Sequence, residues 1–248
     1  MSRPRIAVLA SGGGSNLQAL LDYFKQLGEA RAGDVVLVAS DRPDCGALKR
    51  ARAGGIRAVT IISGYTALGD ELEAILERHS IDIIVLAGYL QLVSADITRR
   101  YAGRIVNVHP APLPQFGGPG MYGKRAHRAV LASGVRMSGP TAHFVDEEYD
   151  HGAVIAHWPV PVRDGDDEQT LADRVLRAEH LLFPRVVQAL AAGELPLLDD
   201  GKLGHPFLRD DVALPPFDAE LDDATLGRQL DAARAERVDT SESRIPIS

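Results

Sequence analysis

Cysteine is nearly absent from this chain, since Cys45 is the only one among 248 residues. A single thiol excludes a disulfide within the chain and leaves no cysteine cluster to hold a metal ion. Cys45 lies in a turn-like Pro-Asp-Cys-Gly segment, where an incidental thiol is far more common than a nucleophile. The cysteine content therefore favours neither a disulfide scaffold nor a cysteine-ligated metal site.

Long hydrophobic runs are missing as well. No uninterrupted apolar stretch approaches the roughly 20 residues that a membrane-spanning helix needs. Residues 1–5 lead into a short apolar run, Ile6 to Ala10, and then into glycines, which does not have the form of a secretory signal. We therefore expect a cytoplasmic protein that does not bind membranes.

An excess of positive charge is also lacking. The formal net charge is −7 and the sequence pI is about 5.6. Because nucleic-acid phosphates require clustered cations, nucleic acid is not expected as the main partner, although local basic groups still allow a small phosphate to bind. What is present is ordinary for a globular protein with a sizeable core, with 45% hydrophobic and 25% charged residues.

Strand and helix patterns alternate through the first hundred residues. The continuous apolar run Ile81–Ala87 is typical of a central parallel strand that is covered on both faces. The alternation predicts an α/β fold with a doubly wound, mostly parallel sheet. The expected strands are Arg5–Ala10, Val35–Ala39, Ala58–Ile62 and Ile81–Ala87, and the expected helices are Asn16–Leu27, Pro43–Gly54 and Leu68–His79.

The rhythm changes in the second half of the chain. Two strands are expected at Thr141–Val145 and Val154–Val162, and their connection is too short for a helical crossover. We therefore predict that they pair antiparallel. The other expected elements are a short helix at His127–Ser133, a long helix at Gln169–Ala192, and one exposed amphipathic helix at Asp222–Val238 that precedes a weakly held tail.

The first expected strand runs into the segment Ser11-Gly12-Gly13-Gly14-Ser15-Asn16. Glycines allow a tight turn and bring free N–H groups to an anion at a helix N-terminus. Neither the Gly-x-Gly-x-x-Gly pattern nor a P-loop lysine is present, so a dinucleotide or triphosphate site is not supported. A small phosphate monoester fits better, and an ordinary tight turn with Ser15 as helix N-cap is an equally good interpretation.

Asn107 and His109 lie two residues apart in a β-branched run, so in a strand both side chains leave the same face. The prolines at 110, 112 and 114 cannot continue a central strand, which puts His109 at the strand's C-terminal end. Open α/β sheets bind ligands at that edge. An amide donor, an imidazole and an acid to orient it would together form an acyl-transfer site.

A carboxylate beside His109 would orient the ring and raise its pKa. Asp150 is the leading candidate, and Asp146, Glu147 and Glu148 lie close to it in the sequence. Spacing alone does not choose among these four acids.

Other polar residues have weaker interpretations. A metal site built from His109, His143, Asp150 and His151 is a minor alternative, because no helix-spaced histidine pair supports it. His143 lies in a strand-like segment and is expected to support the site. Glu179 lies inside a helix, and by itself it is interpreted as a solvated helix charge.

Together these residues resemble the phosphoribosylglycinamide formyltransferases of purine biosynthesis. The matching segments keep the family's order and roughly its spacing from residue 5 to about residue 195. The Asn-x-His-Pro and Asp-x-Gly pair is typical of formyltetrahydrofolate-using hydrolases and transferases, and the Gly-Ser-Asn and Glu-His segments narrow the match. The segments are Ala-Ser-Gly-Gly-Gly-Ser-Asn at 10–16, Val-Leu-Ala-Gly-Tyr at 85–89, Ile-Val-Asn-Val-His-Pro at 105–110, His-Phe-Val at 143–145, Asp-His-Gly at 150–152 and Arg-Ala-Glu-His at 177–180.

The resemblance implies a Rossmann-like formyltransferase fold and a catalytic role for three residues. Asn107 would donate a hydrogen bond to the formyl oxygen as it gains negative charge. His109 would be the proton donor in the same step, and Asp150 would raise the pKa of His109. The co-substrate would be 10-formyltetrahydrofolate, and no metal ion is expected.

Substrate-binding residues follow from the same resemblance. The phosphate of glycinamide ribonucleotide would bind to Gly14, Ser15 and Asn16. Glu179 would bind the glycinamide portion, which reverses its interpretation as a solvated charge. The folate would lie against Leu90, Gln91, Leu92 and Val93, together with Asn107.

This resemblance also implies a division of the chain. Residues 1–195 would form the formyltransferase domain, with a phosphate-binding half at 1–103 and a folate and catalytic half at 104–195. Residues 196–248 would be a C-terminal extension without an assigned function. The partners would be small molecules, and the protein would be a monomer or a homodimer.

The chain departs from the family pattern in three places, and two of them concern the folate side. An arginine that some members place near Tyr65 is not seen there, and Gln91 stands where another arginine is common. Both changes affect how the folate's glutamate tail would be held. The loop at 117–125 is a longer form, and its Lys124 and Arg125 are candidates for binding an anion.

The alternatives are a formyltetrahydrofolate deformylase, another formyl transferase of the superfamily, and a phosphosugar-binding module without catalysis. A deformylase would carry a regulatory domain before the first strand, which is expected at residue 5. A methionyl-tRNA formyltransferase would carry an RNA-binding barrel, for which residues 200–248 are too few and too acidic. A binding module would not need Asn107, His109 and Asp150 together.

Overall fold

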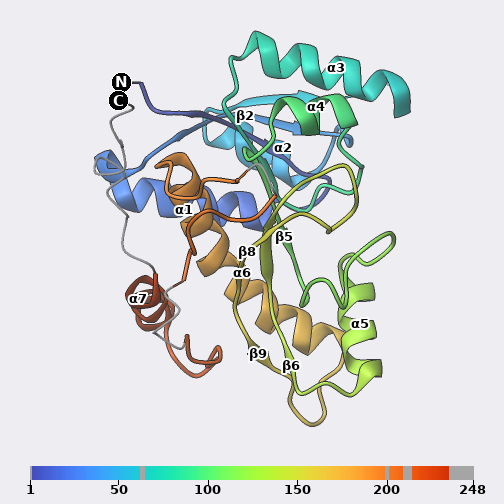
Figure 1. Ribbon diagram of the computed structural model, residues 1–248, viewed down its shortest axis with the longest axis vertical. Helices are drawn as coiled ribbons and strands as arrows, with labels where there is room; N and C mark the ends of the chain where they lie inside the picture. Colours follow the sequence, from blue (N-terminus) through green and yellow to red (C-terminus); the bar gives the residue numbers. More distant parts are fainter. Residues whose placement is uncertain (1, 62–64, 199–200, 209–213, 235–248) are drawn as a thin grey trace, which may run out of the picture.

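Figure 1 shows the computed structural model, which describes residues 2–61, 65–198, 201–208 and 214–234, with the backbone alone for 65–69. Its centre is a seven-stranded sheet in the order β3-β2-β1-β4-β5-β7-β8. The strands are β1 (Arg5–Leu9), β2 (Asp34–Ser40), β3 (Arg57–Thr60), β4 (Ile83–Leu86), β5 (Ile105–His109), β7 (Thr141–Phe144) and β8 (Val154–His157).

The sheet is doubly wound, as predicted. Strands β1 to β5 are parallel, and β1 pairs with β2 on one side and with β4 on the other. The direction of winding therefore reverses between β1 and β4. In open α/β sheets a ligand-binding crevice lies outside the carboxyl ends of the strands at such a reversal.

Side chains alternate along β1 and divide the core into two layers. Ile6 and Val8 face the layer that α1, α2 and α6 cover, whereas Ala7 and Leu9 face the layer under α3 and α4. Figure 1 shows α3 and α4 together at the top of the view, away from α1 and α6. These helices are α1 (Ser15–Leu27), α2 (Gly46–Ala53), α3 (Tyr65–Arg78), α4 (Ala95–Arg100) and α6 (Glu168–Ala191).

The helices α3 and α5 (Lys124–Ser133) each begin three residues before the predicted start, and α2 and α4 differ from the predictions in other ways. The helix expected from Pro43 begins only at Gly46, where an added Cβ would lie 2.6 Å from the Gly13 carbonyl oxygen, so this start packs against the glycine turn. Helix α4 was not predicted, although Ser94 caps it by accepting a hydrogen bond from the Ile97 amide at 3.4 Å. Its length of six residues gives too little periodicity to detect.

Strands β7 and β8 pair antiparallel, as predicted. The single strand expected at Val154–Val162 is wrong, because it divides into β8 and β9 (Val160–Pro161). Strand β9 pairs with β6 (Met137–Ser138) in a separate two-stranded sheet. The division follows a close crossing, since a Cβ on Gly139 would lie 1.9 Å from the Trp158 carbonyl oxygen.

The C-terminal segment folds back onto the domain, which corrects the expected exposed helix. Helix α7 (Asp223–Ala233) is shorter than the predicted Asp222–Val238, whose last residues lie outside the described part of the chain. Leu226 and Leu230 are fully buried, because their i, i+4 spacing presents one apolar face to α6.

Phe217 and Trp158 hold in place the segment that leads into α7. The two rings meet edge to face with centroids 5.3 Å apart. The Trp158 indole nitrogen also donates to the Pro215 carbonyl oxygen at 3.1 Å. The segment before α7 is therefore attached through the core aromatic of the β8–β9 corner.

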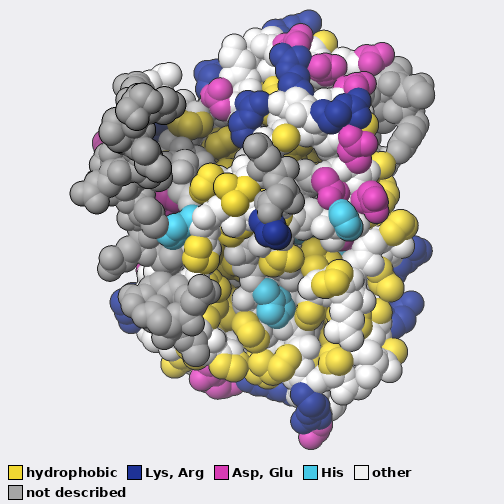
Figure 2. Space-filling view, in the orientation of Figure 1, with side chains coloured by type: hydrophobic (Ala, Val, Ile, Leu, Met, Phe, Trp, Pro, Cys, Tyr) yellow, Lys and Arg dark blue, Asp and Glu magenta, His cyan; other side chains and the backbone are white. Residues whose placement is uncertain are grey.

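The surface is unevenly charged. Figure 2 shows acidic and basic side chains gathered over α3 and α4, while hydrophobic side chains spread across the middle and lower part of this face. Arg100 of α4 forms ion pairs with Glu73 and Glu77 of α3. In the described part of the chain, no helix combines the length and hydropathy that crossing a membrane requires. The remaining helical elements are a 3-10 turn at Gly28–Ala30 and α5 (Lys124–Ser133).

We expect Phe217→Ala to lower the free energy of unfolding by about 3–5 kcal/mol, because it empties a buried ring site beside Trp158. Urea unfolding followed by the fluorescence of Trp158, the chain's one tryptophan, measures this change. Leu198→Ala is the control, since that side chain is 51% exposed. Equal unfolding midpoints for the two variants would show that the segment does not contribute to the core.

Candidate active site

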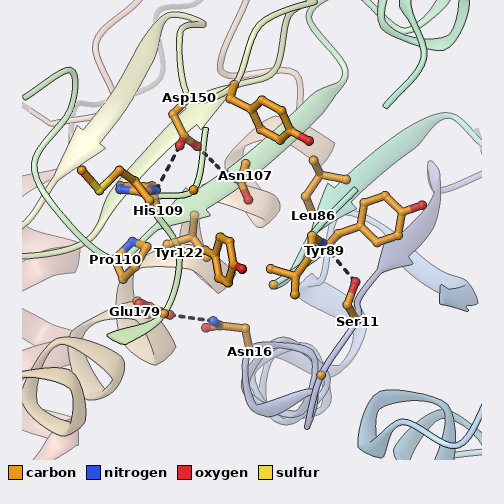
Figure 3. A pocket seen from close by; sticks show the side chains of 18 of the residues that line it. Ser11, Asn16, Leu86, Tyr89, Asn107, His109, Pro110, Tyr122, Asp150 and Glu179 are labelled. Atoms are coloured by element: carbon orange, nitrogen blue, oxygen red, sulfur yellow. Dashed lines mark hydrogen bonds and ion pairs between the residues drawn. The ribbon is translucent and has the colours of Figure 1, made fainter. Parts of the chain in front are cut away.

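A cavity of about 650 Å³ opens at the carboxyl ends of β1, β4 and β5. Ser11 follows β1, Gly88 follows β4 and His109 ends β5, and all three line it. The cavity is of the size that proteins use for small ligands. The switch point of the sheet therefore carries a ligand-sized cavity, whose side chains Figure 3 shows.

Asp150 is the acid that lies beside His109. Its Oδ2 is 3.4 Å from His109 Nδ1. Asp146 instead pairs with His151 at 2.7 Å and Glu147 with Arg99 at 2.9 Å, whereas Glu148 lines the cavity but, among the described residues, forms no ion pair with His109. Geometry thus makes the choice that sequence spacing left open.

The backbone around Asp150 is shaped to present this carboxylate. Asp150 has a positive φ of 55°, a conformation that aspartate tolerates better than most residues. The Gly118 amide donates to Oδ2 at 3.0 Å. A Cβ on Gly152 would lie 2.1 Å from the Phe144 carbonyl oxygen, so only glycine lets the loop lie so close to β7. This contact gives the Asp-x-Gly spacing a structural reason.

Both ring nitrogens of His109 face acceptors. Nδ1 faces Asp150, and Nε2 lies 2.8 Å from the Phe116 carbonyl oxygen. Burial lowers the pKa of His109 and outweighs the raising effects of Asp150 and of the Phe116 carbonyl. The expected influence of Asp150 on the pKa is therefore present, but the net direction in the free protein is downward, toward a neutral ring.

Burial acts to raise the pKa of Asp150. The contacts with the His143 and His109 rings and with the Gly118 amide outweigh burial and bring the pKa below its ordinary value. The free site therefore holds a carboxylate next to a neutral imidazole.

Asn107 lies between His143 and Asp150. Strand pairing puts Asn107 directly opposite His143, and its Nδ2 is 3.0 Å from His143 Nε2. His143 Nδ1 donates to the Phe144 carbonyl oxygen at 2.7 Å, so Nε2 is the acceptor for the amide. The second N–H makes only a long hydrogen bond, to Asp150 Oδ1 at 3.5 Å, which a ligand oxygen can displace. His143 thus orients the amide, as expected of a supporting residue.

The glycine turn leaves free N–H groups at the start of α1. Gly14 is the N-cap, with φ +76° and no side-chain cap, so the interpretation of Ser15 as N-cap is wrong. A Cβ on Gly14 would lie 2.6 Å from Ala47 Cα, which requires glycine here. Unpaired first-turn amides and the positive end of the helix dipole suit an anion.

Glu179 is buried beside this turn, so its interpretation as a solvated charge is wrong. Its side chain accepts a hydrogen bond from Asn16 Nδ2 at 2.7 Å (Figure 3) and is 6% exposed. Burial raises its pKa to about 7, against the lowering effect of the Asn16 bond. Asn16 Oδ1 has no partner among the described residues. The helix periodicity could not predict the burial of Glu179, because the Asn16 contact joins residues far apart in the sequence.

The segment Leu90–Val93 lines the other side of the cavity. Ser11 holds it in place, since its Oγ accepts a hydrogen bond from the Leu90 amide at 3.0 Å. Gln91 Nε2 donates to Asp41 Oδ2 at 3.3 Å. The Tyr65 side chain lies outside the part of the chain that the structure describes.

Several lining residues were not anticipated, and most come from irregular loops that a sequence pattern does not place. Of the two residues that were anticipated as anion-binding candidates, Lys124 lines the cavity, whereas Arg125 stacks over the Tyr122 ring at 5.1 Å. His127 of α5 is buried, its Nδ1 has no partner among the described residues, and burial lowers its pKa to about 4. Tyr89 also lines the cavity, and burial raises its pKa to about 12.

Among the described residues, no group of three or more histidine, cysteine or acidic side chains is arranged to hold a metal ion.

Known proteins are similar to this chain in sequence and in fold. The formyl transferase family matches residues 4–187. A chloroplastic phosphoribosylglycinamide formyltransferase from Arabidopsis thaliana is 41% identical over 204 residues, which are 80% of this chain and 69% of that protein. The chain belongs to the phosphoribosylglycinamide formyltransferase family. The corresponding protein from Vigna unguiculata is 39% identical, and the chain spans 64% of its length.

Solved structures of phosphoribosylglycinamide formyltransferases have the same fold. Glycinamide ribonucleotide transformylase 1 from Symbiobacterium toebii superposes with a TM-score of 0.75 at 35% identity, covering 82% of this chain and 94% of that one. The enzyme from Brucella melitensis gives 0.70 at 39% identity, covering 79% and 99%. A formyltetrahydrofolate deformylase from Pseudomonas syringae, at 22% identity, shares the fold alone. The predicted family and fold are confirmed.

The buried Glu179 carboxyl makes stability depend on pH. Its pKa of about 7 lies above the ordinary value of 4.5, so the folded chain holds a proton that the unfolded chain releases. The stabilisation is present below about pH 4.5 and is lost as the pH rises through about 7. We expect the free energy of unfolding, relative to Glu179→Gln, to fall between about pH 5 and pH 8 in urea titrations. A difference that stays constant with pH would contradict this burial, and Glu220→Gln, at an exposed position, is the matched control.

Proposed function

We propose that this protein transfers a formyl group from 10-formyltetrahydrofolate to the amine of glycinamide ribonucleotide in de novo purine biosynthesis. The observation that carries the proposal is the contact of Asn107, His109 and Asp150 at one edge of a ligand-sized cavity. Free amides at the start of α1 and the buried Glu179 lie at the other side of that cavity. Membership in the formyltransferase family supports the same reaction.

In this proposal Asn107 stabilises the charge that develops on the formyl oxygen. The substrate amine attacks the formyl carbon, and the carbonyl oxygen becomes negative in the tetrahedral intermediate. His143 fixes the amide at 3.0 Å, so one N–H is oriented before the substrate arrives. A preoriented donor needs little reorganisation when the charge appears, which is the basis of an oxyanion hole.

His109 handles the proton in the same step. The attacking amine loses a proton as its bond to carbon forms, and the folate nitrogen gains one as its bond to carbon breaks. A neutral His109 ring can accept and return that proton. The imidazolium would hydrogen-bond to both Asp150 and the Phe116 carbonyl, whereas the neutral ring donates to only one of them. We therefore assign Asp150 the role of stabilising the charged ring.

The substrates would enter from opposite sides. The phosphate would bind at Gly14, Ser15 and Asn16, with Glu179 toward the glycinamide portion. The folate would lie against Leu90–Val93. This arrangement supports the proposed division into a phosphate-binding half (1–103), a folate and catalytic half (104–195) and an extension (196–248). Side chains carry each step of the proposed reaction, which uses no metal ion.

Compartment and assembly belong to the same proposal. We place the protein in the cytoplasm, as a monomer or homodimer that binds small molecules and not nucleic acid. The net charge of −7 supports the exclusion of nucleic acid. Deformylation by water is the alternative reaction, and it is not favoured by relatives named as phosphoribosylglycinamide formyltransferases at 41% and 39% identity.

Purified protein should convert glycinamide ribonucleotide and 10-formyltetrahydrofolate to the formylated ribonucleotide and tetrahydrofolate. Mass spectrometry of the reaction should detect tetrahydrofolate and the formyl amide in equal amounts. Formate production that does not depend on the ribonucleotide would instead identify a deformylase.

Asn107→Ala should lower kcat by roughly 100- to 1000-fold, since it removes an oxyanion donor. Asp150→Asn should lower kcat by roughly 100-fold or more, because the charged His109 ring loses its carboxylate. The matched control is His151→Gln, which removes an exposed side chain next to Asp150. Steady-state kinetics with both substrates measure these changes in kcat. If either variant has the same turnover as the control at neutral pH, the role assigned to that residue is refuted.

A further inference from the structure

A second cavity, of about 700 Å³, lies between α1, α6 and α7. Figure 1 shows α7 on the side of the molecule where α1 and α6 lie. The cavity is lined mainly by polar and charged side chains, unlike the largely apolar folate side of the first cavity. One of its walls is α7, which lies beyond the region that matches the formyl transferase family, residues 4–187.

This second cavity adjoins the glycine turn. Asn16 and Glu179 line the first cavity, whereas their chain neighbours Ser15 and His180 line the second. Ser15 is the first residue of α1, where the helix has no side-chain cap. The free amides of α1 therefore lie at the boundary between the two cavities, where a phosphate would be within reach of groups from both.

Every carboxylate that lines the second cavity is engaged by a donor. A carboxylate that already accepts strong hydrogen bonds repels an incoming anion less than a free one. Arg185 is itself mostly buried, and its bidentate pair holds α7 to α6. The pairs are Gln18 Nε2 with Asp22 at 3.0 Å, Arg177 Nε with Asp223 at 2.6 Å, and Arg185 Nε and Nη2 with Asp231 at 2.7 and 3.0 Å.

Two arginines of the same lining make no ion pair with any carboxylate in the described part of the chain. Arg50 donates to the Gly13 carbonyl oxygen at 2.9 Å and to Gln18 Oε1 at 3.1 Å, both of which are neutral. Arg228 of α7 donates to Thr225 Oγ1 at 2.8 Å. In the described part of the chain the Asp22 charge meets only the neutral Gln18 amide, so the unpaired charges of the lining are two positive and one negative, and their balance is positive.

His180 adds a polar atom without a partner to the same lining. Its Nε2 is buried and has no hydrogen-bond partner among the described residues. It lines the cavity together with Arg50 of α2 and Asp223 of α7. A buried ring nitrogen without a partner is costly unless a ligand satisfies it.

We propose that this cavity binds the phosphate of the ribonucleotide substrate, and that α7 is part of the phosphate site. Arg50 reaches the phosphate from the side of the glycine turn, His180 from α6, and Arg228 from α7. The ligand class is a phosphate monoester dianion. The inference rests on the proposed function for the identity of the substrate, and it adds a C-terminal contribution to phosphate binding.

Gly227 supports this role of α7. A Cβ at this position would lie 2.7 Å from Arg185 Nη2. Glycine thus leaves room for the Arg185 guanidinium that pairs with Asp231, and Arg228, the next residue of α7, lines the cavity. The extension is held by a specific ion pair and not by apolar packing alone.

The test compares Arg228→Gln and Arg50→Gln with the matched control Arg52→Gln, an exposed arginine of α2 that does not line the cavity. Each cavity variant should raise the KM for glycinamide ribonucleotide by about tenfold, because a charge-assisted hydrogen bond is lost. The KM for 10-formyltetrahydrofolate should stay within about twofold. With the dephosphorylated substrate, glycinamide riboside, variants and wild type should show equal kcat/KM.

Calorimetry with inorganic phosphate separates this inference from the proposed function, because it needs no turnover. Wild type and Arg52→Gln should bind phosphate alike, and Arg228→Gln should bind it about tenfold more weakly. If Arg228→Gln matches Arg52→Gln in both KM and phosphate binding, α7 is not part of the site. If wild-type protein binds phosphate but does not formylate glycinamide ribonucleotide, the proposed function is refuted instead.

Discussion

The Asp150 carboxylate is the group on which the rest of the site depends. It faces His109 at 3.4 Å and Asn107 at 3.5 Å, and it accepts a hydrogen bond from the Gly118 amide at 3.0 Å. Through these contacts one charge connects the end of β5 with two loops. Its left-handed backbone and the glycine at 152 are needed to hold it there. A carboxylate fixed in this way can favour a charged imidazole at the moment of proton transfer, although burial keeps the free ring neutral.

Much of this arrangement could be predicted from local patterns. The two-residue spacing of Asn107 and His109, with prolines after them, gave both their shared face and their position at the sheet edge. The alternation of strands and helices gave the doubly wound sheet and hence the switch point. These features depend on short-range periodicity, which a sequence carries directly.

What could not be predicted depends on contacts between distant segments. Spacing did not choose among the acids at 146–150, because the choice follows from where the loop after β7 turns. Glu179 looked solvated, since its partner Asn16 is 163 positions away. The helix α7 looked exposed because its partners, among them Arg185, lie on α6. In each case a tertiary contact, not a propensity, decided the outcome.

The coupling between Asp150 and His109 is the central claim, and the pKa of the His109 ring tests it most directly. Nitrogen-15 NMR titration of wild-type protein should give a pKa below the ordinary 6.5, because burial lowers it. In Asp150→Asn the pKa should fall further, since the carboxylate that raises it is gone. A His109 pKa that is unchanged or higher in Asp150→Asn would contradict the account.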